Sequence, residues 1–213
     1  MAIDTDPKQA APTDDAPKSK GKLGFLGELP ILIITALVLA LVIKAFLFQA
    51  FFIPSSSMEP TLYPGDRVLV NKIPYYFGDP ERGDIVVFEN PDPASQVDRG
   101  IVGGFVHWLA QGLGVSSNPE EDFIKRVIGE PGDTVEGRNG QVFVNGLPID
   151  EPYLTQKTDD FPPETVPDGE LFVMGDNRGS SRDSRFGLGT VPLDKVVGKA
   201  FVKIWPPSRI GLL

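Results

Sequence analysis

Residues 123–135 read Phe-Ile-Lys-Arg-Val-Ile-Gly-Glu-Pro-Gly-Asp-Thr-Val, and this stretch indicates the fold of the chain. A run rich in β-branched and aromatic residues, Phe123–Ile128, is followed by Gly132-Asp133, and Thr134-Val135 begin a second run. Glycine supplies the positive φ of a tight turn, and aspartate hydrogen-bonds the backbone that follows it. The stretch therefore predicts a strand, a turn and a second strand.

The same pattern recurs along the chain from about residue 65 onward. Gly65-Asp66 and Gly83-Asp84 precede short β-branched runs, and Gly175-Asp176 is interpreted as a turn of the same kind rather than as a metal site. Asn139-Gly140 and Asn145-Gly146 are typical of tight hairpins. Further strands are expected at Val68–Val70, Ile85–Phe88, Gln141–Val144, Glu170–Met174 and Val196–Ile204. Many short strands with frequent turns predict a mainly β, antiparallel fold.

Two segments depart from this pattern. Residues 151–169 are rich in Pro and Asp and are interpreted as an exposed loop. Residues 92–122 form a long connection with one helix-like piece, in which Phe105, Trp108, Leu109 and Leu113 share a face opposite His107. A helix that covers the core is favoured here over a surface lid or a membrane-touching helix.

An apolar stretch, Leu29–Phe48, precedes the β pattern. Its 20 residues carry one charge, Lys44, and a helix of that length matches a bilayer core about 30 Å thick. Pro30 suits the first turn of a helix. The stretch predicts one uncleaved transmembrane helix over residues 23–48, which we call the anchor.

The charges beside the anchor predict its orientation. Lys18, Lys20 and Lys22 stand immediately before the span, and a Lys/Arg excess marks the cytoplasmic side. Residues 1–22 lack apolar periodicity and are expected to be a disordered cytoplasmic tail. Residues 49–213 are expected to form a domain on the extracytoplasmic side of the cell membrane.

Composition excludes several kinds of chemistry. The chain has no Cys, so thiol nucleophiles and zinc–thiolate sites are excluded. It has one histidine, His107, so a Ser-His-Asp triad would have to use it and a His-rich metal site is impossible. We expect no metal and no organic cofactor. The net charge of -9 gives no reason to expect nucleic-acid binding.

A serine cluster, Ser55-Ser56-Ser57, lies between Pro54 and Pro60 directly after the anchor. With no cysteine and one histidine, a serine nucleophile would most simply use a neutral lysine as its base. Such a lysine needs apolar neighbours that lower its pKa. Strand alternation offers two candidates, Lys125 between Phe123 and Val127, and Lys199 between Val197 and Phe201, and does not choose between them.

Four blocks of the chain together resemble the type I signal peptidases, membrane-bound Ser-Lys proteases that remove signal peptides from exported proteins. The blocks occur in the order found in that family, and the likeness covers about residues 29–206. They are Ile53–Leu62, Arg82–Phe88, Phe123–Asp133 and Gly175–Arg178 continuing to Ser184–Gly187. The resemblance implies the antiparallel β-sheet catalytic domain of the signal-peptidase type, in a compact form with a single anchor.

The resemblance also implies roles for individual residues. It makes Ser57 the nucleophile and Lys125 the general base, in preference to Lys199, with Ser55 and the Ser57 N–H forming the oxyanion hole. Ser181 matches the serine that orients the lysine. A structural charged cluster is implied for Asp176, Arg178, Asp183 and Arg185, and substrate-pocket lining for Ile53, Met58, Leu62 and Ile124.

Some positions depart from the family pattern. Ser56 stands where several relatives have glycine, and Gly179-Ser180 varies from familiar relatives. The second domain of larger members is reduced to at most about residues 136–170, and residues 92–122 have no counterpart.

The implied activity is cleavage of preproteins after small-x-small motifs through an acyl-enzyme, with signal peptides and membrane lipid as partners. Two alternatives are weighed against it. A self-cleaving repressor would carry a basic helix-turn-helix domain in place of the acidic tail and anchor. An inactive membrane-tethered binding protein of the same fold would bind substrate without cutting it.

Overall fold

The structure is a computed structural model that describes residues 22–72, 78–91 and 122–213, with only the helical backbone given for residues 22–27 and 41–46. The chain divides into two units, Met1–Leu39 and Ala40–Leu213. The predicted tail, His107 and the helix-like piece of the long connection lie outside the described residues.

A single α-helix, α1, runs from Lys22 to Leu47 and covers most of the predicted anchor. It ends one residue earlier than expected, because Phe48 begins the first strand. Pro30 lies inside the helix, so its placement in the first turn was wrong. A search of the described residues finds no helix with both the length and the apolar character needed to span a bilayer.

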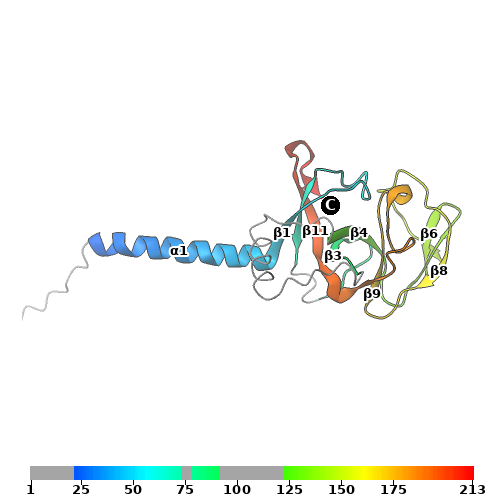
Figure 1. Cartoon of the computed structure of the whole chain (residues 1–213), viewed down its shortest axis with the longest axis horizontal. Helices are drawn as coiled ribbons and strands as arrows, with labels where there is room; N and C mark the ends of the chain where they lie inside the picture. Colours follow the sequence, from blue (N-terminus) through cyan, green and yellow to red (C-terminus); the bar gives the residue numbers. More distant parts are fainter. Residues whose placement is uncertain (1–21, 73–77, 92–121) are drawn as a thin grey trace, which may run out of the picture. The chain divides into compact units, whose positions relative to one another are not determined.

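The larger of two sheets has eight strands, and its neighbouring strands all pair antiparallel. Its main path follows the order β1 (Phe48–Phe52), β2 (Arg67–Asn71), β11 (Val196–Trp205), β3 (Ile85–Glu89), β4 (Asp122–Gly129), β9 (Glu170–Met174) and β10 (Val191–Pro192), while β12 (Gly211–Leu212) pairs with β11. Figure 1 shows the long orange strand β11 between β1 and the green strands β3 and β4. Strands far apart in sequence thus lie beside each other, and β4 is a central strand.

The smaller sheet has four strands in the order β7 (Leu147–Pro148), β6 (Gln141–Val144), β5 (Thr134–Arg138) and β8 (Phe161–Thr165). Short 3₁₀ helices occupy Arg178–Ser180, Leu193–Lys195 and Pro207–Arg209. Both predicted Asn-Gly hairpins are present. Asn139 and Asn145 have φ values of 55° and 53°, and the glycine after each is also positive, as two-residue hairpin turns require. The predicted mainly β, antiparallel fold class is confirmed.

Three of the four Gly-Asp pairs are turns, as predicted. Gly65, Gly83 and Gly132 have φ values between 85° and 95°. The aspartate side chains accept hydrogen bonds from the N–H groups of Tyr63, Glu81 and Glu130, in each case three residues before the aspartate. The expectation that each aspartate would bond the backbone after it was therefore wrong, because the side chain closes the turn from its end.

The expectation of an exposed loop over residues 151–169 was correct only in part, because most of the segment is exposed but not all of it is loop. β8 lies within it, and Thr158 and Val166 are buried. Val166 packs with Val135 of the smaller sheet and with Phe172 of the larger one in a cluster that joins the two sheets. The segment is thus mostly exposed with buried positions at Thr158 and Val166, and the periodicity of its short strand was too weak to detect.

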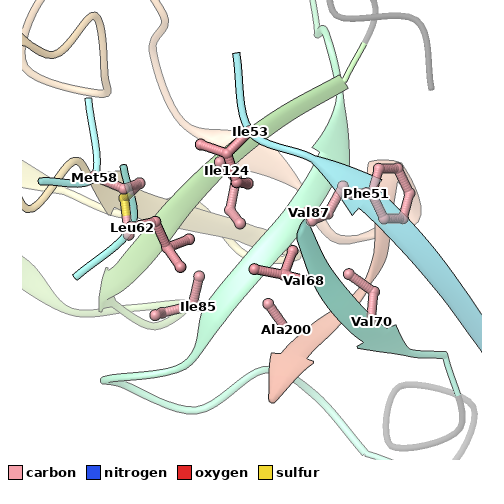
Figure 2. Packing of buried hydrophobic residues seen from close by; sticks show 10 residues of the cluster. All are labelled: Phe51, Ile53, Met58, Leu62, Val68, Val70, Ile85, Val87, Ile124 and Ala200. Carbon is pink, nitrogen blue, oxygen red and sulfur yellow. The ribbon is translucent and has the colours of Figure 1, made fainter. Parts of the chain in front are cut away.

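Two further apolar clusters fill the larger sheet. One surrounds β3, β4 and β9 and contains Val86, Phe88, Val127, Leu171, Val173 and Val191. The other consists of Phe51, Ile53, Met58, Leu62, Val68, Val70, Ile85, Val87, Ile124 and Ala200, all labelled in Figure 2. Alternate residues of β4 thus face different clusters, as strand geometry requires.

Candidate active site

Ser57 lies in the loop that connects β1 to β2. The base of this loop is closed by two backbone hydrogen bonds, from Ile53 N to Asp66 O and from Gly65 N to Ile53 O, both 2.9 Å long. Met58 and Leu62 follow the serine and are fully buried against the sheet, as Figure 2 shows. The loop is therefore packed down by apolar side chains, and this holds the Ser57 backbone in a defined place.

Lys125 extends from the middle of β4. Its strand neighbours on the same face, Val127 and cross-strand Val86, are both fully buried. The lysine itself is only 3% exposed, and its Nζ lies 2.8 Å from the Ser57 Oγ. The amine also donates to the carbonyl oxygen of Ile124 at 2.9 Å. The structure thus brings together the serine and lysine that the resemblance paired.

Burial governs the protonation of this lysine. Desolvation lowers the pKa of Lys125 from 10.5 to about 8, while the charges of Asp183 and Asp176 oppose the shift by raising it. Desolvation is the larger effect because the ammonium form loses its hydration inside the apolar cluster. A usable fraction of the amine is therefore neutral near pH 7.

Lys199, the other lysine that strand alternation offered, has a different environment. Its side chain is 39% exposed and forms an ion pair with Asp84. The apolar burial that a neutral lysine requires is therefore missing at Lys199. Of the two strand lysines, only Lys125 has both the burial and a serine hydroxyl within reach.

Ser55 lies at the exposed side of the same loop. Its Oγ is 3.3 Å from the Ser57 Oγ, so the two hydroxyls flank one small region of space. An oxyanion-hole donor must lie beside the attacked carbonyl, next to the nucleophile. The position of Ser55 is compatible with the role that the resemblance implies, which stays a prediction.

Ser181 is near the serine loop but makes no hydrogen bond with Lys125. Its Oγ is buried without a hydrogen-bond partner. A Cβ built at Gly175 would lie 2.2 Å from that Oγ and 2.4 Å from the Ser57 carbonyl oxygen. The Ser181 hydroxyl and the Ser57 carbonyl therefore both lie against the same side of Gly175, and the lysine-orienting role of Ser181 stays a prediction.

Gly175-Asp176 is not a turn that enters a strand, so the interpretation of this pair was wrong. Gly175 follows the end of β9, and its φ is not positive as the φ of a turn glycine would be. Asp183 accepts its N–H at 3.0 Å, and Arg178 donates to its carbonyl at 3.1 Å. Two residues later, Asn177 N donates to the Ser57 carbonyl at 3.0 Å. Gly175 is glycine because the serine loop passes too close for any side chain, a requirement that only the tertiary structure reveals.

The four residues of the predicted charged cluster do not pair among themselves as one group. Asp183 pairs with Arg185 at 2.9 Å, whereas Asp176 receives a two-point contact from Arg126, at 2.9 and 2.7 Å. Thr61 of the serine loop also donates to Asp176, at 2.5 Å. Arg126, adjacent to Lys125, is thus a site residue that the sequence analysis missed, although it lies within the block Phe123–Asp133.

Arg178 pairs with a residue that sequence reasoning placed in an exposed loop. It donates to both carboxylate oxygens of Glu151, at 2.5 and 3.1 Å, and to the Thr158 hydroxyl at 2.5 Å. Glu151 also accepts from Tyr153, whose ring covers the Arg126 guanidinium at 3.8 Å. No local pattern indicated these contacts, because they join segments about 25 residues apart.

The four residues expected to line substrate pockets are all buried. Ile53, Met58, Leu62 and Ile124 belong to the cluster that packs the serine loop onto the sheet. They stabilise the loop in this structure, and their contact with substrate stays a prediction. Within the described ranges, no group of three or more His, Asp or Glu side chains is placed to hold a metal ion.

Comparison with known proteins adds a second line of evidence. Residues 26–205 match the family described as "Signal peptidase, peptidase S26". The chain belongs to this family. The predicted family and activity, a serine endopeptidase that removes signal peptides, are therefore confirmed.

Curated relatives from several bacteria agree with this assignment. The chain is 43% identical to a probable signal peptidase I-2 from Synechocystis sp., over 87% of this chain and 76% of the relative. It is 38% identical to signal peptidase I from Mycobacterium tuberculosis, over 96% and 80%, and 37% identical to that from Bacillus licheniformis, over 91% and 96%. A crystal structure of a signal peptidase I from Enterococcus faecalis shares 31% identity and covers 57% of this chain and 97% of its own, with a TM-score of 0.41.

Proposed function

We propose that this signal peptidase cleaves preproteins with Ser57 as nucleophile and Lys125 as general base. The neutral Lys125 amine takes the hydroxyl proton as the Ser57 oxygen attacks the scissile carbonyl carbon. The resulting ammonium returns that proton to the leaving amine when the carbon–nitrogen bond breaks. Lys125 then deprotonates the water that hydrolyses the serine ester, which frees Ser57 and the cut signal peptide.

The observation that carries this proposal is the 2.8 Å contact between Ser57 Oγ and a lysine amine that is almost completely buried. Proton transfer requires a base within hydrogen-bond reach and with a pKa near the working pH. Lys125 meets both conditions, since its pKa is lowered to about 8. Lys199 is 39% exposed and forms an ion pair with Asp84.

The oxyanion that forms on the scissile carbonyl would be stabilised by the Ser57 N–H and the Ser55 hydroxyl. The loss of one such donor typically lowers kcat by about 100- to 1000-fold. Ser55 is suited to this role because its Oγ lies 3.3 Å from that of Ser57 and faces the exposed side of the loop. Ser181 would support the lysine from its buried position beside Gly175.

The substrate would bind as an extended strand, with two small side chains entering shallow pockets bounded by Ile53, Met58, Leu62 and Ile124. Their dense packing supports this, because a closely packed apolar floor leaves room for small residues only. The proposed cleavage motif is therefore small-x-small.

The proposed setting is the cell membrane, with helix α1 as a single-pass anchor, the N-terminus in the cytoplasm and the catalytic domain outside. The 20 residues from Leu29 to Phe48 with one charge, and the lysines before them, support it. Anchoring the enzyme on the same surface as its substrate raises their effective concentration.

The test uses the full-length protein in detergent or liposomes and a preprotein substrate. Ser57→Ala and Lys125→Ala are expected to lower kcat by at least about a thousandfold, because nucleophile and base act as one unit. Lys199→Ala is the matched control, since it removes another strand lysine outside the site, and is expected to keep activity within about twofold. Near wild-type turnover of Lys125→Ala at neutral pH would show that the base is misassigned.

A further inference from the structure

The segment after β7 brings Glu151 and Tyr153 beneath the charged groups of the active site. The Glu151 carboxylate is almost buried and is held by Arg178 at 2.5 Å and by the Tyr153 hydroxyl at 2.7 Å. Arg178 is itself fixed, because it donates to Thr158 and to the carbonyl oxygen of Gly175. The Tyr153 hydroxyl is thus attached to an acceptor that cannot move freely.

The Tyr153 ring covers one face of Arg126, the neighbour of Lys125 in β4. The guanidinium carbon lies 3.8 Å from the ring centroid, within the range of a strong cation–π contact. All three nitrogens of the same guanidinium form hydrogen bonds: Nε and one terminal nitrogen bind Asp176, and the other terminal nitrogen binds the Gly83 carbonyl at 2.8 Å. Edge and face together hold Arg126 in a single orientation.

That orientation affects the charge balance around the Lys125 amine. The carboxylates of Asp176 and Asp183 raise the pKa of Lys125 against the desolvation that lowers it. Each carboxylate has its own arginine, Arg126 for Asp176 and Arg185 for Asp183. The other groups packed against the lysine are uncharged: the Ser57 hydroxyl from the loop and Val86 from β3.

We propose that Tyr153 is a positioning residue of the peptidase, which holds Arg126 flat against Asp176 so that the carboxylate does not keep a proton on Lys125. Tyr153 acts through Arg126 and touches neither Ser57 nor the scissile bond. Without the ring, Arg126 is held by its edge alone and its contact with Asp176 loosens, and a carboxylate with a weaker cationic partner favours the ammonium form of Lys125. The proposal rests on the proposed Ser57–Lys125 chemistry.

The test compares the pH dependence of kcat/KM for full-length variants. Tyr153→Leu is expected to move the midpoint of the rising limb upward by about one pH unit. The corresponding loss is about tenfold at pH 7 and less than about twofold at pH 9.5, where the amine is neutral in both proteins. Tyr153→Phe keeps the ring over Arg126 and is expected to retain the wild-type midpoint.

Phe143→Leu is the matched control. The Phe143 ring covers Arg138 at 3.9 Å in the smaller sheet, so the variant removes the same kind of contact away from the dyad. Its midpoint is expected to be unchanged. Should Tyr153→Leu fail to fold, Tyr153→Met fills a similar volume without a ring and is expected to show the same shift.

An unchanged midpoint in the folded Leu or Met variant would overturn the proposal, as would a loss of equal size at every pH, which is what a purely structural role produces.

The experiments distinguish a failure of the Ser57–Lys125 proposal from a failure of the Tyr153 proposal. Activity that survives in Ser57→Ala or Lys125→Ala contradicts the dyad, whereas inactive dyad variants together with an unshifted Tyr153→Leu contradict only the role of Tyr153.

Discussion

At the scale of single residues, the buried Lys125 amine links stability to chemistry. Its environment lowers the pKa from 10.5 to about 8, and the reason is desolvation in an apolar strand face. The same desolvation that prepares the base must oppose folding whenever the amine is charged. The lowered pKa of Lys125 therefore affects both the catalytic rate and the stability of the fold.

The first prediction concerns the rate. Because only the neutral amine can accept the Ser57 proton, kcat/KM is expected to rise about tenfold per pH unit below pH 8 and to level off above it. The measurement is preprotein cleavage by the full-length enzyme between pH 6 and 9.5. A flat profile, or a midpoint near 6.5 as for histidine, would contradict a lysine base.

The second concerns stability. The folded pKa of Lys125 lies below the unfolded one, so between pH 8 and 10.5 the unfolded chain binds more protons and stability rises with pH. At pH 7 the full cost of burying the charged Lys125 amine is present, and it is about 3 kcal/mol for a pKa shift of this size. Lys125→Met is therefore expected to abolish activity and to raise the free energy of unfolding by about 1–3 kcal/mol, after the loss of its hydrogen bonds.

Urea unfolding at pH 7 and pH 10 measures this effect. The increase in the free energy of unfolding caused by Lys125→Met should become smaller toward pH 10, because the wild-type amine is neutral there in the folded protein. Lys199→Met serves as control, because its exposed ion pair contributes at most about 1 kcal/mol. A Lys125→Met protein less stable than wild type at pH 7 would show that the lysine is not buried in its charged form.

At the scale of elements, the site depends on one crossing. The end of β9 runs past the β1–β2 loop, and Gly175 is the contact point between them. Its N–H is held by Asp183 and its carbonyl by Arg178, while the next backbone donor, Asn177 N, holds the Ser57 carbonyl. Asp183 and Arg178 therefore hold the backbone at Gly175, and this backbone in turn positions the Ser57 loop.

Gly175→Ala tests this crossing. The new Cβ would lie 2.4 Å from the Ser57 carbonyl oxygen, so loop and strand must separate. We expect a loss of about 1–3 kcal/mol in stability and of at least about a hundredfold in kcat, because small displacements of a catalytic group are costly. Gly211→Ala, whose Cβ would meet no atom within 4 Å, is the control and is expected to have little effect on either quantity.

At the scale of the whole molecule, the two sheets share one apolar cluster, and the polar network from Glu151 to Asp176 connects the segment beside the smaller sheet to the catalytic strand. The smaller sheet and the segment that follows it thus support the site. Helix α1 is described separately, and its proposed role is attachment to the membrane.

Charges placed in the middle of α1 test that role. Ile34→Lys combined with Leu37→Lys is expected to cost roughly 5–7 kcal/mol of insertion free energy, at about 2.5–3.5 kcal/mol for each charge near a helix centre. The double variant should leave the membrane fraction on centrifugation of lysed cells. Leu212→Lys, at an exposed position in β12, should not change the distribution. An unaltered membrane fraction for the double variant would contradict anchoring by α1.

The amino-acid sequence by itself determined the local features of this protein. Glycine and asparagine placed the turns, because only they adopt positive φ readily, and strand alternation showed that Lys125 and Lys199 each had apolar neighbours on their own strand face. Four short blocks together identified the family. Short strands such as β8, and the contacts of Glu151, had no local signature.

Strand alternation did not choose between the two lysines and the family resemblance favoured Lys125, but only the tertiary structure showed that Lys125 is buried against a serine while Lys199 is paired and partly exposed. It also showed why residue 175 is glycine and how Tyr153 reaches Arg126. The physical reason is the same in each case. Burial, close approach and charge pairing arise between segments far apart in the chain, and their energies depend on distances that a linear pattern of residues does not contain.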